Sequence, residues 1–241
     1  MFTTTRWSLA LAGLCVLAGC SPEAADTEAP ADQAAAPQAP EAGGSWDVRF
    51  DDPAADAGGF AMAEQPGGWT VKTGPTGSAI TWRTQDMVEG GAFQAGATIE
   101  ERSAPAEHRE GYGLILGGRN LQAPDQVYTY FLVRGSGEYL IKRRDGANTP
   151  TLMDWTAAPS IQKVVNEGDA TRNRLEVRVR PDSTAFLVNG AQVAMLATDA
   201  VQPYGIAGIR ANHALDLSIT EFAVQGGDRQ AMPADSMAAH P

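Results

Sequence analysis

Residues 174–196 read RLEVRVRPDSTAFLVNGAQVAML, and this stretch decides the fold class. Over residues 174–180 apolar and charged residues alternate strictly. Successive side chains of a strand point to opposite faces, so Leu175, Val177 and Val179 share one face and the charges share the other. The pattern predicts an antiparallel strand with one face against the core and one in water.

The second half of the same stretch predicts a β-hairpin. The apolar runs 185–188 and 192–196 flank Asn189-Gly190. Asn-Gly is the strongest short hairpin signal because both central residues of the turn need a positive φ. A last strand alternates over 215–220, and residues 148–169 are expected to form a long loop with a short strand in it. The other candidate strands are 69–72, 79–82, 93–100, 112–118, 127–134 and 139–143.

Residues 46–225 contain no amphipathic helix of three turns, so the strands have no helical partner to pack on. Many short strands with hairpin turns favour two sheets that bury each other's apolar faces. The sequence therefore predicts an all-β fold, a jelly-roll sandwich of two antiparallel sheets. Trp46 and Trp69 are expected in its core.

The N-terminus predicts export and lipidation. Residues 7–18 form a short apolar run that is too brief to span a bilayer and ends at Leu17-Ala18-Gly19-Cys20. This ending resembles the lipobox of bacterial lipoproteins, which implies that residues 1–19 are a signal peptide and that Cys20 carries diacylglyceryl and acyl (palmitate) chains. The resemblance implies a membrane partner, and Ser21, in place of a retention aspartate, favours the outer membrane.

Composition separates the flanks from the folded part. Residues 20–45 are rich in Ala, Pro and acidic residues and lack aromatic and branched aliphatic side chains, which predicts a disordered linker between Cys20 and the domain. Residues 226–241 are expected to be a disordered tail. The chain has 241 residues and a net charge of −11, of which −6 belongs to residues 46–225. This acidity argues against nucleic acid as a partner.

The strand motifs together suggest a superfamily. They resemble the concanavalin A-like lectins and glucanases, above all the laminin-G-like domains and the family described as 3-keto-disaccharide hydrolases. The resemblance implies a jelly roll that serves as lectin, hydrolase or interaction module. The motifs that carry it are Gly111-Tyr-Gly-Leu-Ile-Leu-Gly-Gly, Tyr128-Thr-Tyr-Phe-Leu-Val-Arg, Gly137-Glu-Tyr-Leu-Ile-Lys, Trp155, Asn173-Arg-Leu-Glu-Val, Phe186-Leu-Val-Asn-Gly and Gly205-Ile-Ala-Gly-Ile-Arg.

Carboxylate motifs for glycoside hydrolysis are missing from the sequence. The Glu-x-Asp-x-x-Glu pattern of the superfamily's retaining glucanases is absent. The adjacent pairs Asp51-Asp52 and Glu100-Glu101 would point to opposite faces of a strand, and we expect them to be solvated turn or edge charges. Carboxylates from distant strands remain an open alternative, with Glu138, Asp145 and Asp154 as examples.

Nucleophilic catalysis has equally little support. A Ser-His-acid site would need His108 or His213, because His240 lies in the predicted tail. Ser136 lies between two glycines and reads as a turn between strands. We therefore expect a protein that is not an enzyme.

A metal site is weakly indicated at the start of the domain. No cofactor is implied with certainty, and the sequence lacks the thiols and paired histidines of a zinc site. The resemblance allows a structural calcium ion held by loop oxygens, and the candidate ligands are Asp51, Asp52 and Asp56. An ordinary Asp-rich turn is the alternative reading.

One strand face combines residue types that suit a sugar. Alternation over 127–134 places tyrosines and an arginine opposite a core face that contains Phe131. Aromatic rings stack on sugar C–H faces, and guanidinium or amide groups bind hydroxyls or an acidic sugar. The alternative is a set of half-buried sheet residues. The candidate ligand-binding residues are Tyr128, Tyr130, Arg134, Lys142, Arg144, Trp155, Arg210, Asn212 and His213.

These observations predict a membrane-anchored, exported lipoprotein whose β-sandwich binds a glycan or another envelope ligand without catalysis. Two alternatives stay open. One is a glycoside hydrolase of the 3-keto-disaccharide type, which the resemblance implies, and the other is a structural module that binds an envelope protein.

Overall fold

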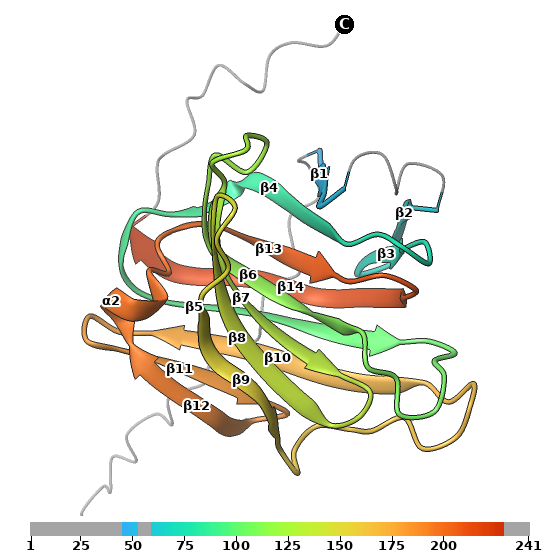
Figure 1. Ribbon diagram of the computed structural model, residues 1–241. Coiled ribbons are helices and arrows are strands. Elements are labelled where there is room, and N and C mark those ends of the chain that lie inside the picture. Colours follow the sequence, from blue (N-terminus) through green and yellow to red (C-terminus); the bar gives the residue numbers. More distant parts are fainter. Residues whose placement is uncertain (1–44, 53–58, 229–241) are drawn as a thin grey trace, which may run out of the picture. The chain divides into compact units, whose positions relative to one another are not determined.

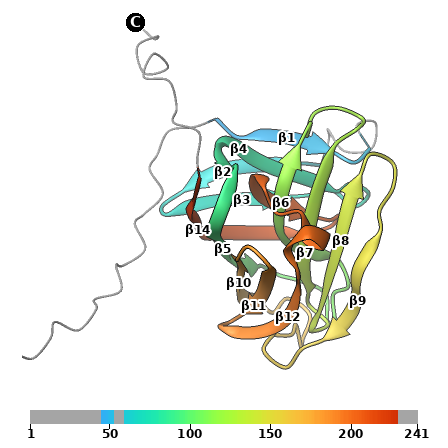
Figure 2. The same cartoon turned by 90° about the vertical axis from the view of Figure 1, so that its left-hand side faces the viewer.

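Two antiparallel sheets of seven strands make up the part of the chain that the computed structural model describes, residues 45–52 and 59–228. Figures 1 and 2 show these two layers from two directions. Sheet A has the strand order β1 (Asp47–Phe50), β4 (Ala79–Val88), β13 (Gly205–Ala211), β6 (Gly111–Arg119), β7 (Val127–Arg134), β8 (Glu138–Asp145) and β9 (Thr151–Ala157). Sheet B has the order β12 (Ala191–Ala197), β11 (Ser183–Val188), β10 (Thr171–Val179), β5 (Gly90–Glu101), β14 (Asp216–Asp228), β3 (Gly68–Lys72) and β2 (Ala61–Gln65).

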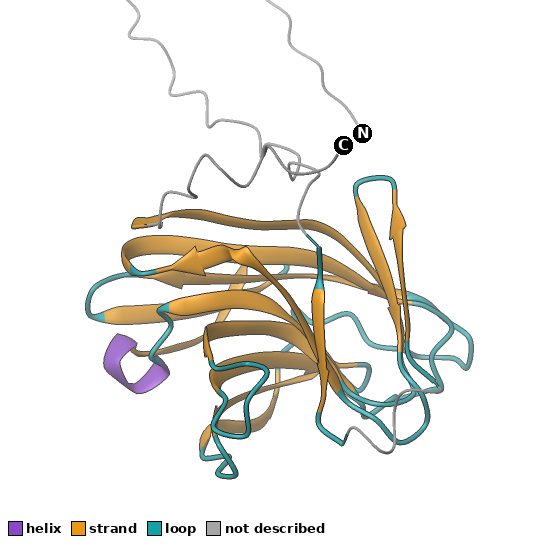
Figure 3. Cartoon of the chain, turned by 90° about the horizontal axis from the view of Figure 1, so that it is seen from above, coloured by secondary structure: helices purple, strands orange, loops and turns teal. Residues whose placement is uncertain are grey.

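The hairpin predicted from Asn189-Gly190 is confirmed. The two residues have φ angles of 52° and 81°, and β11 pairs with β12 across them, with Val188 opposite Ala191. A single helical turn, α2 (Thr198–Val201), then leads from sheet B to β13 in sheet A (Figure 3). The predicted all-β sandwich of two antiparallel sheets is therefore the observed fold.

The main core lies between the sheets, where the inward faces of both meet. Leu175, Val177 and Val179 are buried in this core, as their alternation predicts. Aromatic rings pack edge to face in its centre, with Phe131 of sheet A and Phe186 of sheet B 5.2 Å apart. The core also contains Trp69, as predicted, and Trp46 packs against it from its edge.

Strand β7 is buried on both faces, which alternation alone does not predict. Its inward face supplies Phe131 and Val133 to the main core, and the buried hydroxyl of Thr129 donates to the carbonyl of Val201 at 2.5 Å. Its outward face supplies Tyr128, Tyr130 and Leu132 to a second cluster. Sheet A therefore carries apolar side chains on both sides.

The predicted signal peptide, Cys20 and the linker lie outside the described residues. Strand β14 continues to Asp228, three residues beyond the predicted end of the domain, and residues 229–241 are outside the described part as well. In the region that is described, no helix has the length and apolar character needed to cross a membrane.

Candidate functional site

The outward side of sheet A holds a second apolar layer, here called the aromatic face. Period-2 alternation on β4, β6, β7 and β8 points one set of side chains away from the main core. On most sheets this side is polar, yet here Trp82 is 3% exposed and Tyr130 is 8% exposed. The members are Ile80, Trp82, Ile115, Leu121, Tyr128, Tyr130, Leu132 and Leu140, with Trp155 and Ile206 packed against them.

Arg210 is the charged centre of this face. Its Nη1 donates to the Tyr128 hydroxyl at 3.0 Å, and its Nη2 donates to Asp51 Oδ2 at 2.6 Å. Its guanidinium carbon lies 5.2 Å from the centre of the Tyr130 ring. Burial acts to lower the pKa of Arg210, but Tyr128 and Asp51 outweigh it and raise the pKa above its ordinary value. The guanidinium is therefore a permanent positive charge under the face.

The tyrosines take different positions around this charge. Burial raises the pKa of both Tyr128 and Tyr130, so both stay neutral phenols. Tyr128 is 1% exposed, so its ring lies beneath the surface and its hydroxyl holds Arg210 in place. Tyr130 lies against Tyr128, with ring centres 5.8 Å apart. The structure thus brings Tyr128, Tyr130 and Arg210 together, as the sequence predicts for one face.

Asp51 completes this group from the segment after β1. Burial raises its pKa, but the hydrogen bond and charge of Arg210, with Arg144 and Arg49 farther off, lower the pKa below the ordinary 3.8. Arg49 also donates from Nη1 to the backbone oxygens of Leu121 and Ala123. Asp51 lies exposed in a bend, as expected, but its carboxylate is also the ionic partner of Arg210, which the sequence did not predict.

We predict a pH-dependent cost for Asp51→Asn. A carboxyl whose folded pKa lies below its unfolded value of 3.8 stabilises the fold above pH 3.8, and this contribution is lost as the pH falls through the folded pKa. The free energy of unfolding of the variant should be lower by about 1 kcal/mol at neutral pH, and not by more, because the carboxylate is only partly buried. Urea unfolding of both proteins over a pH series measures this. The stabilities of the two proteins should converge as the pH falls below 3.8 and through the folded pKa. In an Arg210→Met background the difference in stability should disappear. A difference that stays constant at every pH contradicts the assignment.

Trp155 and Arg134 form a second group of contacting side chains on the face. Trp155 lies on β9, the short strand within the predicted loop, and is partly buried. The Arg134 guanidinium carbon lies 4.0 Å from the centre of its ring. Glu138 holds Arg134 through Nε at 2.9 Å and Nη2 at 2.7 Å. A Cβ at Gly111 would come within 3.1 Å of the indole, so glycine makes room for this ring.

Lys142 and Arg144 extend the positive charge along β8. Lys142 is directly opposite Tyr130 and Arg144 is opposite Tyr128 in the antiparallel register. Arg144 Nε donates to the carbonyl of Gly146 at 2.6 Å, whereas the half-buried Lys142 has no hydrogen-bond or ionic partner among the described residues. Lys142 is thus a cation that is free to bind a ligand beside an aromatic ring.

Asn212 and His213 lie just past the end of β13. The backbone nitrogen of Asn212 donates to the carbonyl of Gly111, and its side-chain Oδ1 is buried without a partner. His213 Nε2 lies 2.9 Å from Glu110 Oε1 and its side chain is 43% exposed. His213 therefore faces Glu110 at the surface, and no hydrogen bond or ion pair among the described residues joins it to Arg210 or Trp155.

The calcium ligands predicted at the start of the domain are not brought together. Both oxygens of Asp51 accept from Arg210, Asp52 is exposed, and Asp56 lies outside the described residues. Within the described residues no group of three or more His, Cys, Asp or Glu side chains is arranged to hold a metal. The candidate ligands that the structure describes therefore do not form a calcium site.

The prediction for Glu101 was wrong. This side chain is 0% exposed, and its Oε1 lies 2.5 Å from His108 Nδ1. A usable signal was present, because Ile99 points inward and residue 101 has the same parity on β5. The prediction rested instead on the general tendency of acidic side chains to be solvated. The tertiary fold brings His108 next to Glu101, and this contact offsets part of the cost of burial. Ser136 lies in the turn between β7 and β8, as predicted.

The fold is a lectin-like β-sandwich. No family model matches the sequence, and no curated protein matches it. Among solved structures, the carbohydrate-binding module CBM66 from Bacillus subtilis aligns with a TM-score of 0.52 at 9% identity, covering 75% of this chain and 95% of that one. A Bacillus subtilis protein of unknown function with a galectin-like fold aligns at 0.51 and 12% identity, covering 77% and 90%. These likenesses show the fold.

A third solved structure is the lumenal domain of VIP36 in its Ca²⁺- and mannose-bound form. It aligns with a TM-score of 0.48 at 8% identity, covering 76% of this chain and 86% of that one.

Proposed function

We propose that this protein is an exported lipoprotein whose sandwich binds glycans on the aromatic face. The observation that carries the proposal is the partly exposed Trp155, whose ring centre lies 4.0 Å from the guanidinium carbon of Arg134. A fixed indole is a platform on which a sugar C–H face can stack, and it loses little side-chain entropy on binding. The carbohydrate-binding module with the same fold supports the proposal.

The charges around the platform favour an acidic sugar. Lys142 and Arg144 lie beside the tyrosines, and Arg210 keeps a positive charge beneath them. The two carboxylates of Asp51 and Glu138 neutralise only part of this positive charge, because Arg49 and Arg134 add two more guanidinium groups. A carboxylate on the sugar could pair with Lys142, which has no other ionic partner among the described residues. Salt screens such a pair, so binding should weaken as salt is added.

A glycan array probed with the full-length protein in detergent tests this function. Trp155→Ala should weaken binding of any hit about 10- to 30-fold, because removal of a central aromatic anchor costs about 2 kcal/mol or less. Trp155→Phe should keep part of the affinity. Val165→Ala is the matched control, since Val165 is an apolar side chain that is 71% exposed elsewhere.

Two results would refute glycan binding on this face. The first is a wild-type protein that retains no glycan on the array. The second is a Trp155→Ala variant that folds normally and binds a hit as tightly as the wild type does. Product analysis of each hit also separates binding from the hydrolase alternative.

The lipid anchor is a separate part of the proposal and rests on the sequence alone. The apolar run 7–18 and the tetrad ending in Cys20 support it. Mass spectrometry of the mature protein should find an N-terminus at Cys20 that carries diacylglyceryl and acyl chains, and Cys20→Ala should remove both. An unmodified Cys20 would contradict anchoring and leave glycan binding unaffected. Fractionation of the two membranes would test the outer-membrane location.

A further inference from the structure

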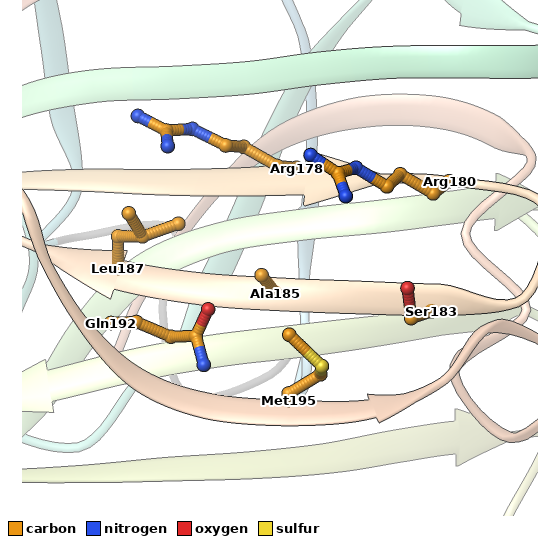
Figure 4. A pocket seen from close by; sticks show the side chains of 7 residues that line it. All are labelled: Arg178, Arg180, Ser183, Ala185, Leu187, Gln192 and Met195. Atoms are coloured by element: carbon orange, nitrogen blue, oxygen red, sulfur yellow. The ribbon is translucent and has the colours of Figure 1, made fainter.

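The outward side of sheet B has a hollow at its β12 edge, which we call the arginine hollow. Its volume is about 120 Å³, and Figure 4 shows the side chains that line it. Arg178 and Arg180 extend along β10 on one side, and Gln192 and Met195 of β12 lie on the other. The hollow belongs to the opposite sheet from the aromatic face, so it is a different place on the molecule.

The register of three strands makes the hollow. On β10 the residues Leu175, Val177 and Val179 face the core, so the arginines with the opposite parity face outward. Arg178 is opposite Ala185 on β11, and Ala185 is opposite Met195 on β12. The small side chain of Ala185 lies between the long side chains of Arg178 and Met195, and this difference in size leaves the space of the hollow. The floor is therefore set by strand pairing and does not depend on a loop.

The donors at the hollow are largely unused. Arg178 Nε donates a hydrogen bond to Glu176 Oε1, so both terminal nitrogens of the guanidinium can still donate to a ligand. Arg180 has no acidic partner within the described part of the chain, and its side chain is exposed. The amide of Gln192 likewise makes no hydrogen bond to any described residue. Guanidinium groups match the planar geometry of a carboxylate, which accepts two parallel hydrogen bonds.

Two acidic side chains nearby limit the charge that the hollow accepts. Glu176 is bonded to Arg178, and Asp182 accepts from the hydroxyl of Ser183 at the rim. A doubly charged phosphate would meet both of these carboxylates, whereas a single carboxylate can bind Arg180 at lower repulsion. The electrostatics thus favour a monoanion.

The rest of the wall is apolar. Leu187 and Ala185 form its floor, and Met195 is 56% exposed, which is unusual for a large apolar side chain. The volume of about 120 Å³ compares with an engineered cavity of about 150 Å³ that binds benzene, so it takes roughly four to eight non-hydrogen atoms. An anion with a short hydrocarbon part would use both halves of the hollow.

We propose that the arginine hollow binds a carboxylate attached to a short apolar chain. The carboxylate lies between Arg180 and Arg178, with the amide of Gln192 as a further donor. The apolar chain lies against Leu187 and Met195. A free short-chain acid and the C-terminus of a peptide that ends in an apolar residue share this chemistry.

Calorimetric titration of the full-length protein with butyrate tests the proposal, with butyramide as the uncharged probe of the same shape. Butyrate should bind at one site, and butyramide should bind at least about tenfold more weakly. Arg180→Gln should reduce butyrate affinity about tenfold or more. Met195→Ala should weaken butyrate more than acetate. Arg172→Gln is the matched control, because Arg172 is an exposed arginine on the same face of the same strand.

A second set of titrations separates the two sources of the carboxylate. Ala-Ala-Leu with a free C-terminus is compared with the same peptide carrying a C-terminal amide. Tighter binding of the free peptide than of butyrate supports a peptide terminus, and binding of butyrate without the peptide supports a free acid. The proposal is overturned if neither binds, or if Arg180→Gln binds as the wild type does. Trp155→Ala should leave butyrate binding unchanged, so this test and the glycan test fail independently.

Discussion

His108→Ala is expected to lower the free energy of unfolding by about 3–5 kcal/mol, which is a large part of the stability of a domain. Glu101 is 0% exposed, and its Oε1 lies 2.5 Å from His108 Nδ1. Its other oxygen, Oε2, is buried with no hydrogen-bond partner among the described residues. Removal of the imidazole would leave a buried carboxyl group with no side-chain partner for either oxygen among the described residues. Urea unfolding followed by tryptophan fluorescence measures the loss.

A second histidine provides the matched control for this prediction. His213 pairs with Glu110 at 2.9 Å, but its side chain is 43% exposed. His213→Ala should therefore cost less than about 1 kcal/mol. The double variant His108→Leu with Glu101→Leu should recover much of the loss, because it removes both polar partners together. Equal losses in the two histidine variants would show that burial of the Glu101 pair is energetically unimportant.

Arg210→Met is expected to lower the free energy of unfolding by about 2–4 kcal/mol. Methionine keeps most of the volume, so the loss reports the guanidinium rather than a cavity. The Tyr128 hydroxyl would lose its 3.0 Å donor in a buried position, and Asp51 would lose its ion pair. Lysine should not restore the wild-type stability, because one ammonium cannot replace the fork that binds both partners.

Arg174→Met is the matched control for Arg210→Met. Arg174 also pairs with a carboxylate, Glu221 at 3.0 Å, but the two side chains are 37% and 52% exposed. The Arg174→Met variant should therefore lose less than about 1 kcal/mol in free energy of unfolding. A double-mutant cycle between Arg210→Met and Asp51→Asn should give a coupling energy above about 0.5 kcal/mol. An Arg210→Met variant as stable as the Arg174→Met control would refute the central role of this charge.

Much of the candidate face was predictable from local spacing. Alternation over residues 127–134 places Tyr128 and Tyr130 on the side opposite Phe131, and the structure confirms that side. Their depth was not predictable, because burial depends on Trp82, Leu121 and Leu140 arriving from other strands and loops. Tyr128 in consequence is a buried hydrogen-bond partner of Arg210, whereas Trp155 remains partly exposed.

Burial of charge was the least predictable feature. Asp51 and Arg210 are 159 positions apart, and no local pattern connects them. Glu101 and His108 are only seven positions apart, yet an acidic residue at a strand end is usually solvated. In both cases the carboxyl group contacts a partner whose position follows from the packing of the whole sandwich.

By itself the sequence did not predict β1 and β2, but it determined most of the strands, the Asn189-Gly190 hairpin and the sides to which residues of the alternating strands point. These follow from a two-residue period and from the φ values that a turn requires, which are local properties of the backbone. Only the tertiary structure decided which strands are neighbours, as when β5 comes to lie between β10 and β14. Those pairings set burial and charge contacts, because both depend on what reaches a side chain from elsewhere in the chain.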